Sequence, residues 1–489
     1  MTVSAAPIST GVSGLDTILG GGVSQGAMVF IVGQPGAGKT ILGSQLVFEA
    51  VRRGEKALVL TAFSEGHVKL IEHLRPFTFF DEAQVGQAVT LLALQTLLDG
   101  SPAGGATALL RTIRETGARL VLIDGFQGVP DLFADPRAVR QMLVGLSSLL
   151  SYVDVTLVIT LEGNGRDPAL MGLLTTADVM LGLDYRIDGL RHSRHVEVIK
   201  QRGQAPLAGL HPYTITAQGL TVFPRLEARL LPPARPRLAA RAAFGLPELN
   251  ALLGGGLTAR TTTVMAGAPG AGKTTLALHW ALAEAQPERR TVFVSFAEHE
   301  EELREKARAF GMDLDPALAS GALTLMRISP SEIIPDIVAT QLLDALTATT
   351  ERLVIDDITG LVRALGARAP DYLAALNDQL YALDMTSLVS YEVDAFTGFA
   401  FDLARTPLAL VAHNVLVVQQ VAVDGVLHRM LAVLKMRFSA HDRTLRELVL
   451  DAQGVRVLSP AQTPGTLDAG GTLSSGHNPP ATERDQPPR

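Results

Sequence analysis

The chain contains no cysteine among its 489 residues. This excludes disulfide bonds, thiolate metal sites and a cysteine nucleophile, and it is typical of a protein of the reducing cytoplasm. Long hydrophobic runs are also missing, because no stretch reaches the roughly 18 apolar residues that a membrane-spanning helix needs. The first residues carry neither the positive charge nor the apolar segment of a signal peptide. We therefore expect a cytoplasmic protein without membrane attachment.

Positive charge is not in excess either. Lysine and arginine number 42 against 49 aspartates and glutamates, which gives a formal net charge of −7. A mildly acidic protein is poorly suited to strong, non-specific binding of duplex nucleic acid. Apolar residues make up 47% of the chain, enough to bury large cores, and the length is sufficient for two or three domains.

A glycine-rich stretch with the pattern G-x-x-x-x-G-K-T organises the chain. It follows an apolar run at 28–32 and precedes a helical pattern at 41–51, which is the strand–loop–helix context of a phosphate-binding loop. Its glycines allow backbone N–H groups to point at phosphate oxygens, and the helix dipole adds positive potential. We expect Lys39 to reach the β- and γ-phosphates of ATP and the Thr40 hydroxyl to bind Mg²⁺. The stretch comprises Gly33, Gln34, Pro35, Gly36, Ala37, Gly38, Lys39 and Thr40.

The same stretch occurs a second time. Triple glycines at 20–22 and 254–256 precede the two copies, and further features recur at nearly constant spacing. Such self-similarity predicts a duplicated domain with two nucleotide-binding loops. The second loop comprises Gly267, Ala268, Pro269, Gly270, Ala271, Gly272, Lys273 and Thr274, followed by Thr275.

Near-continuous apolar runs alternate with helical patterns in both halves, which indicates a parallel sheet covered on both faces. One run in each half ends in an aspartate, Asp124 and Asp356. An apolar strand ending in aspartate is the second part of a loop-type nucleotide site, so both aspartates are expected near Mg²⁺ together with Thr40 and Thr274.

Two further strand ends are candidates for chemistry. One strand in each half ends in a carboxylate, Glu65 and Glu298, which makes these residues candidate catalytic groups. A later strand in each half ends in a Lys-x-Arg pair. Those pairs are Lys200 with Arg202 and Lys435 with Arg437. The residues alone leave open whether these pairs contact phosphate or are exposed strand-end charges.

Composition also predicts the boundaries of the domains. We expect a first domain at 1–228, a linker at 229–240, a second domain at 241–457 and a disordered tail at 458–489. The linker is rich in proline and arginine, and a semi-rigid spacer is favoured over a basic patch for nucleic acid. The tail has few large apolar residues and therefore little to bury.

With these motifs in place, residues 8–457 resemble the KaiC branch of the RecA-like ATPases. The stretches Lys200-Gln201-Arg202-Gly203 and Lys435-Met436-Arg437 are similar to the ends of that family's two domains. The resemblance implies an α/β fold of two tandem RecA-like P-loop NTPase domains, each a mostly parallel sheet with helices on both faces.

The resemblance also implies ATP and Mg²⁺ as ligands and self-assembly into a ring, usually a hexamer, with ATP between subunits. In such a ring the two Lys-x-Arg pairs would reach a neighbour's γ-phosphate and neutralise charge on the transferring phosphoryl group. A role in signalling or regulation would require a protein partner, whose identity the residues leave open.

The chain departs from the family's pattern after the second strand of each half. The family often has paired glutamates there, and the first is the usual candidate base. The aligned pairs are Ser64-Glu65 and Ala297-Glu298, so only the second carboxylate remains. Since a one-residue shift along a strand turns a side chain to the other face, we expect Glu65 and Glu298 to be poorly aimed and hydrolysis of ATP to be slow.

Three alternatives stay open beside a slow ATPase. A clock-type serine/threonine autokinase needs an adjacent Ser-Thr pair, but Ala409-Leu410 stand at that place and cannot accept phosphate. A DNA-directed accessory ATPase of the RecA/RadA type needs a basic loop, yet residues 125–136 contain no lysine or arginine, so no nucleic-acid partner is expected. A non-hydrolysing scaffold whose ring state reports the ATP level is the third.

Overall fold

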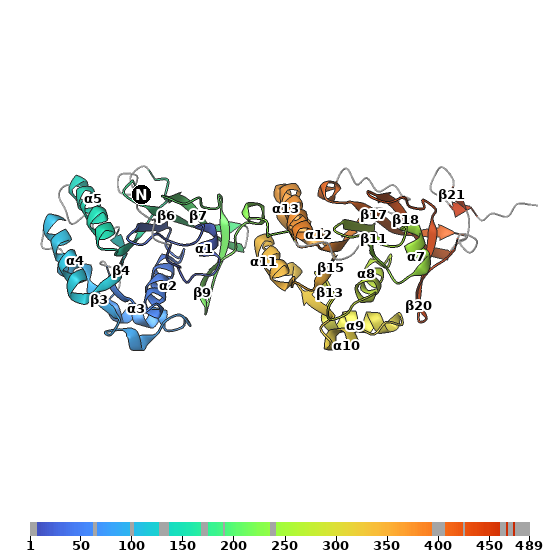
Figure 1. Cartoon of the computed structure of the whole chain (residues 1–489), viewed down its shortest axis with the longest axis horizontal. Helices are drawn as coiled ribbons and strands as arrows, with labels where there is room; N and C mark the ends of the chain where they lie inside the picture. The colour runs from blue at the N-terminus through green and yellow to red at the C-terminus, as the bar shows by residue number, and fades with distance from the viewer. Residues whose placement is uncertain are drawn as a thin grey trace, which may run out of the picture. The chain divides into compact units, whose positions relative to one another are not determined.

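The structure is a computed structural model, and the chain divides into two compact units, Met1–Arg229 and Leu230–Arg489 (Figure 1). The residues described are 7–61, 66–97, 102–126, 136–167, 175–188, 191–234, 241–393, 406–423, 426–459, 466–467 and 473–474.

The first unit is built on a nine-stranded sheet of order β3-β2-β4-β5-β1-β6-β7-β8-β9. The strands from β3 to β6 pair in parallel, and β6 to β9 form an antiparallel meander. The strands are β1 (Met28–Gly33), β2 (Lys56–Thr61), β3 (Val89–Ala93), β4 (Ala118–Asp124), β5 (Thr156–Glu162), β6 (Val179–Asp188), β7 (Arg191–Gln201), β8 (His211–Thr216) and β9 (Gly219–Val222). The helices are α1 (Leu15–Ile18), α2 (Lys39–Arg52), α3 (His67–Leu74), α4 (Pro102–Thr116) and α5 (Pro136–Tyr152).

The second unit repeats this topology strand for strand, in the order β14-β13-β15-β16-β12-β17-β18-β19-β20. The strands are β12 (Thr262–Gly267), β13 (Arg290–Ser295), β14 (Leu323–Arg327), β15 (Thr350–Asp356), β16 (Thr386–Glu392), β17 (Asn414–Val423), β18 (Val426–Met436), β19 (Arg446–Asp451) and β20 (Gly454–Val457). The helices are α7 (Pro247–Leu252), α8 (Lys273–Leu282), α9 (Glu300–Ala309), α10 (Asp315–Ala319), α11 (Pro335–Ala345), α12 (Thr359–Leu365) and α13 (Ala369–Ala382). A short pair, β10 (Arg241–Ala242) and β11 (Leu257–Thr258), precedes the glycine-rich loop.

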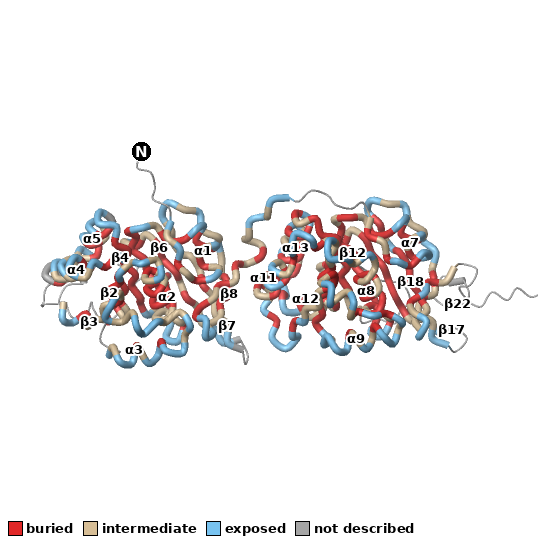
Figure 2. The backbone as a smooth tube through the Cα atoms, turned by 60° about the horizontal axis from the view of Figure 1, so that its bottom comes forward, coloured by how far each residue is buried: buried red, intermediate tan, exposed pale blue. Residues whose placement is uncertain are grey.

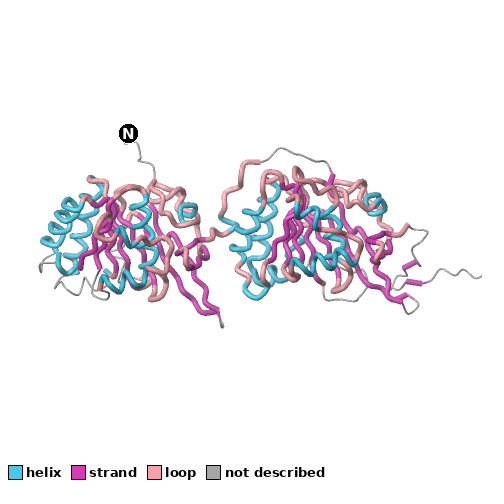
Figure 3. Tube along the Cα trace, turned by 90° about the horizontal axis from the view of Figure 1, so that it is seen from below, coloured by secondary structure: helices cyan, strands magenta, loops and turns pink. Residues whose placement is uncertain are grey.

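Alternating side chains of the central strand fill two cores. In β1, Val29 and Ile31 join the cluster on the α2 side, whereas Phe30 joins the cluster that contains Leu109 of α4 and Leu143 of α5. The strands are buried and helices lie on both faces of each sheet (Figures 2 and 3). The predicted α/β architecture of tandem, mostly parallel sheets is therefore confirmed.

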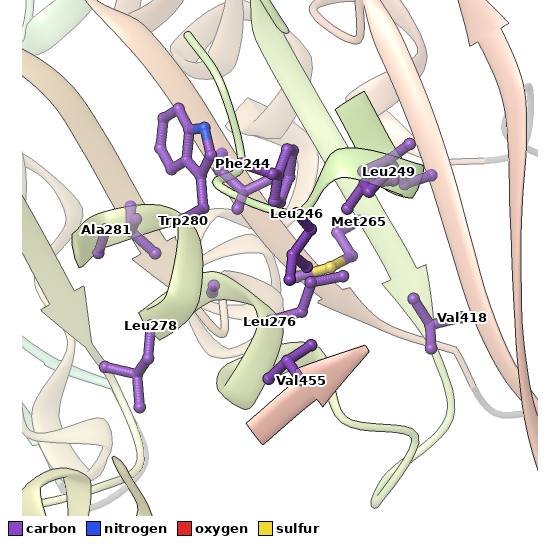
Figure 4. Packing of buried hydrophobic residues seen from close by; sticks show 14 of the residues in the cluster. Phe244, Leu246, Leu249, Met265, Leu276, Leu278, Trp280, Ala281, Val418 and Val455 are labelled. Carbon is purple, nitrogen blue, oxygen red and sulfur yellow. The ribbon is translucent and has the colours of Figure 1, made fainter. Parts of the chain in front are cut away.

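The second unit has a core of the same kind around α8. Leu276 and Trp280 of α8 pack with Met265 of β12 and Phe244 (Figure 4). The Phe244 and Trp280 rings lie 6.1 Å apart between centroids, and the Arg352 guanidinium lies 5.1 Å from the Trp280 ring. These contacts fix the helix that follows the second loop.

The predicted linker and tail are described only in part. Of the linker, 229–234 are described, and Gln379 of α13 donates a hydrogen bond to the Leu230 carbonyl oxygen over 3.3 Å. In the tail, β21 (Thr466–Leu467) pairs with β22 (Leu473–Ser474). Residues 458–459 of the tail are also described, and the rest of both segments lies outside the described residues. Within the part of the chain that the structure describes, no helix is long and apolar enough to cross a bilayer.

Trp280 is the only tryptophan and is fully buried, so its fluorescence reports unfolding of the second unit. We predict that Leu276→Ala lowers the free energy of unfolding of this unit by about 2–5 kcal/mol, because Leu276 is completely buried and the change leaves a cavity. The matched control is Leu427→Ala at a side chain that is 65% exposed, with a cost below about 0.5 kcal/mol. Equal denaturation midpoints for the two variants would contradict this core assignment.

Candidate functional site

In each unit the glycine-rich loop connects the end of a central strand to a helix. The first loop joins β1 to α2 and the second joins β12 to α8. Gly38 and Gly272, the residues before the two helices, have φ of 91° and 101°, a conformation that favours glycine. The strand–loop–helix context that the sequence predicts is therefore present twice.

The loop lysines lie folded against their own loops. Lys39 Nζ donates to the carbonyl oxygens of Gly33 and Gln34 at 2.9 and 3.0 Å. Lys273 Nζ donates to Gly267 and Ala268 at 2.8 and 3.0 Å. Each ammonium group is thus held by backbone carbonyl groups of its own glycine-rich loop.

Both predicted hydroxyl–carboxylate pairs are assembled. Thr40 Oγ1 lies 2.9 Å from Asp124 Oδ2, and Thr160 Oγ1 lies 2.6 Å from Asp124 Oδ1. In the second unit Thr274 and Ser390 both donate hydrogen bonds to Asp356. Thr160 and Ser390 were missed by sequence reasoning, and the signal that could have found them is a hydroxyl residue two positions before the glutamate that ends each of the matching strands β5 and β16.

The donor set fits Mg²⁺ rather than a metal caged by protein alone. Among the described residues no group of three or more histidine, aspartate or glutamate side chains could hold a metal ion. Mg²⁺ in nucleotide sites is bound by one or two side-chain oxygens, with phosphate and water completing the octahedron. Burial raises the pKa of Asp356, with Glu298 and Asp357 adding to the rise against hydrogen bonds from Ser390 and Thr274. A divalent cation would stabilise the ionised form of this carboxylate.

Two further carboxylates lie beside the loops. Glu162 at the end of β5 is the register partner of Gly33, and Glu392 at the end of β16 is the partner of Gly267. Burial lowers the pKa of Lys39, whereas Glu162 and then Asp124 raise it. Strand register, which the linear sequence does not give, is what places these glutamates at the site.

Lys273 lies in the same kind of environment. It is 9% exposed, and burial lowers its pKa. Three carboxylates oppose that shift: Asp357, Glu392 and Asp356. The second site is therefore a cluster of acidic groups around one buried cation.

Glu298 does not lie on a strand, which differs from the expectation. Strand β13 ends at Ser295, and the Phe296 N–H donates to the Asp356 carbonyl oxygen at 2.7 Å. The alternation of side chains along a strand therefore does not set the direction of Glu298, and that reason for poor aim was wrong. Lys306 of α9 contacts Glu298 Oε1, and Glu298 Oε2 is buried without a hydrogen-bond partner among the described residues. Glu65 lies outside the described residues.

The Lys-x-Arg pairs do not lie beside the glycine-rich loop of their own unit. Lys200 faces Met180 and Met180 faces Phe30, three residues before Gly33 in β1. Three strand residues span about 10 Å, and Lys200 Nζ donates to the Thr175 carbonyl oxygen at 3.0 Å, away from the loop.

The second pair has the same placement. Lys435 faces Val415, three residues before Val418, which is the partner of Gly267. Its ammonium group donates to the Ala412 carbonyl oxygen at 2.7 Å. In the first unit, Arg202 pairs with Asp178 at 3.3 Å. Both pairs thus lie at the end of their sheet that is opposite the loops.

Comparison with known proteins gives matches over most of the chain. The family model described as "ATPase: KaiC" matches residues 8–227 and 242–462. The circadian clock oscillator protein KaiC of Picosynechococcus sp. is 25% identical over 92% of this chain and 89% of its own length. The protein of that name from Synechococcus elongatus is 25% identical, over 96% and 94%, and KaiC 1 of Synechocystis sp. is 26% identical, over 91% and 88%.

The two loops predict two nucleotide sites in each chain. We expect Lys39→Ala and Lys273→Ala each to remove one of two ATP sites, because each lysine supplies the charge at its own loop, and the double variant to remove both. Isothermal titration with Mg-ATP measures the stoichiometry. Lys56→Ala, at an exposed lysine on β2, is the control and should keep both sites. One site in the parent, or two sites in all variants, would rule out this assignment.

Proposed function

The chain belongs to the KaiC family of ATPases, and on that premise we propose that it is a slow, Mg²⁺-dependent ATPase in signalling or regulation that assembles into a ring with ATP between subunits. The observation that supports this most is the lysine held by its own loop in each unit, buried at Lys273 and half-buried at Lys39, beside a threonine–aspartate pair. An ammonium group, a metal-binding hydroxyl and a carboxylate at one strand edge are the parts that phosphoryl transfer uses.

The loop residues act mainly by positioning and by charge. ATP supplies the phosphoryl group, and Mg²⁺ would be held by Thr40 with Asp124 and by Thr274 with Asp356. Lys273 would exchange its carbonyl partners, Gly267 and Ala268, for phosphate oxygens. Such preorganised charge stabilises developing negative charge in the transition state.

Glu298 is the remaining candidate base of the second site. Its Oε2 atom is buried and has no hydrogen-bond partner among the described residues. Glu298 also lies close enough to Asp356 to raise the pKa of that carboxylate. Both observations suit a group that accepts a hydrogen bond from water. Ala297 stands where the family often has the first glutamate of a pair. With one carboxylate instead of two, we infer slow turnover.

The Lys-x-Arg pairs support assembly. Lys435 lies at the end of its sheet opposite its own loop, and we infer that it contacts phosphate bound on a neighbouring subunit. Arg437 follows it past the end of β18. Burial lowers the pKa of His413, and Arg437 and then Lys435 lower it further. The two cations therefore share one surface, as a pair serving a neighbour's site requires.

The clock-type autokinase is the less favoured alternative. Ala409 and Leu410 lie in a described 3-10 turn, Pro407–Leu410, and neither has a hydroxyl group. The residues of the loop that a DNA-directed ATPase would use, 127–135, lie outside the described residues.

The departure at Ala297 generates a prediction on rate. Ala297→Glu should raise turnover at saturating Mg-ATP by about ten-fold or more, because general-base assistance contributes roughly 10²–10⁴-fold. Ser64→Glu should act likewise in the first unit. The matched control is Ala297→Gln, which has the same size without a base. Release of phosphate is the measurement, and equal rates for the Glu and Gln variants would reject the explanation.

Assembly generates a second prediction, tested by mixing. Lys273→Ala disables the second loop and leaves the Lys-x-Arg pair of that unit intact. Arg437→Ala disrupts the pair and leaves the second loop intact. If the pair acts on a neighbour, a mixture of the two variants should hydrolyse ATP faster than the sum of the separate proteins. Mass by light scattering, with and without Mg-ATP, accompanies the assay. Strictly additive rates, or a monomer mass at saturating Mg-ATP, would contradict the ring.

A further inference from the structure

We propose that Lys306 of α9 is a positioning residue for hydrolysis at the second site, where it holds one oxygen of Glu298 so that the other is left to orient the attacking water. This inference rests on the proposed ATPase function. Lys306 lies outside the loops, the aspartate-ended strand and the Lys-x-Arg pair.

The contact is built into the start of α9. Lys306 lies eight residues after Glu298 and its ammonium group bonds to Glu298 Oε1, with side chains 30% and 24% exposed. The helix begins at Glu300 with a reciprocal cap in which the His299 N–H donates to Glu302 Oε2 at 2.6 Å. A capped helix start fixes the position of Lys306 relative to the preceding turn.

The turn that contains Glu298 is attached on its other side to the metal site. The Glu298 N–H donates to Ser295 Oγ at 2.9 Å, and the Phe296 N–H donates to the Asp356 carbonyl oxygen at 2.7 Å. Glu298 is thus held between α9 and the end of β15. Its second oxygen, Oε2, is buried and has no partner among the described residues. A buried carboxylate oxygen needs a donor, and water is the donor that such a site admits.

A lysine suits this task for chemical reasons. Its ammonium group only donates, so it binds Oε1 without acting as a proton acceptor. The other cations of α9 pair elsewhere, since Arg304 and Arg308 both contact Asp315. The residue that stands eight positions after Glu65 in the first unit is His73, so a lysine at this place is a feature of the second unit.

In the step itself, Glu298 accepts the proton that water loses as the water oxygen bonds to the γ-phosphorus. The bond between that phosphorus and the bridging oxygen breaks, and ADP leaves with the bonding electron pair. Lys306 takes no part in the bond changes. Its loss should therefore slow turnover while leaving the binding of ATP intact.

The test uses the full chain in a Lys39→Ala background, so that turnover comes from the second site. Lys306→Met should lower kcat by about ten-fold or more, with KM and nucleotide affinity within about two-fold, because Lys306 acts through a general base. Lys306→Arg should retain most of the activity. Arg308→Met is the matched control on the same helix, with the same loss of charge, and should equal the parent.

Equal kcat in Lys306→Met and Arg308→Met would overturn the role of Lys306, as would a parallel loss of nucleotide affinity. Glu298→Gln tests the assignment of Glu298 as the base separately from the role of Lys306. Full turnover in Glu298→Gln would contradict the assigned base, whereas its loss with full turnover in Lys306→Met would contradict Lys306 alone.

Crystal structures provide a readout that needs no turnover. We expect the Glu298 carboxylate to leave its position beside Asp356 in Lys306→Met and to keep it in Lys306→Arg. An unmoved carboxylate in both variants would overturn the inference. A parent without turnover would contradict the proposed hydrolysis, and the crystal structures would then decide whether Lys306 positions Glu298.

Discussion

Each half of the molecule depends on holding one ammonium group at the end of its central strand, buried at Lys273 and half-buried at Lys39. Burial disfavours a charged lysine, so the charge must be compensated locally. At Lys273 two loop carbonyls bind the ammonium group, and the nearby carboxylates favour its charged state. A parallel sheet provides those carboxylates, because the ends of β12, β15 and β16 meet at one edge.

The same sheet separates two kinds of charge. The acidic residues around the loop lie at the carboxyl ends of the parallel strands. Lys435 of β18 instead faces Val415, three residues back along β17 from the partner of Gly267, and donates to the Ala412 carbonyl oxygen. On the proposed function, each unit would bind its nucleotide at one end of its sheet and present its Lys-x-Arg pair at the other end. Assembly of copies would bring the two ends together and make turnover depend on neighbouring subunits.

Much of this could be predicted from the sequence, because the glycine-rich loops have a rigid local pattern and occur twice. Asp124 and Asp356 follow from their apolar strands and constant spacing. Glu162 and Glu392 could not be assigned roles, since only strand register places them beside the loops. The position of Glu298 was misjudged because the end of β13 at Ser295 is not marked in the sequence. Its contact with Lys306 depends on how α9 packs, which periodicity alone does not give.

The central claim is that ATP is bound by the loop of one subunit and contacted by the Lys-x-Arg pair of the next. Cryo-electron microscopy of the full chain with Mg²⁺ and a slowly hydrolysed ATP analogue tests it most directly. The account predicts a closed ring in which the phosphates at Lys273 of one subunit contact Lys435 and Arg437 of the neighbouring subunit. Nucleotide bound to separate monomers, or a ring in which these two residues lie far from every nucleotide, would contradict it.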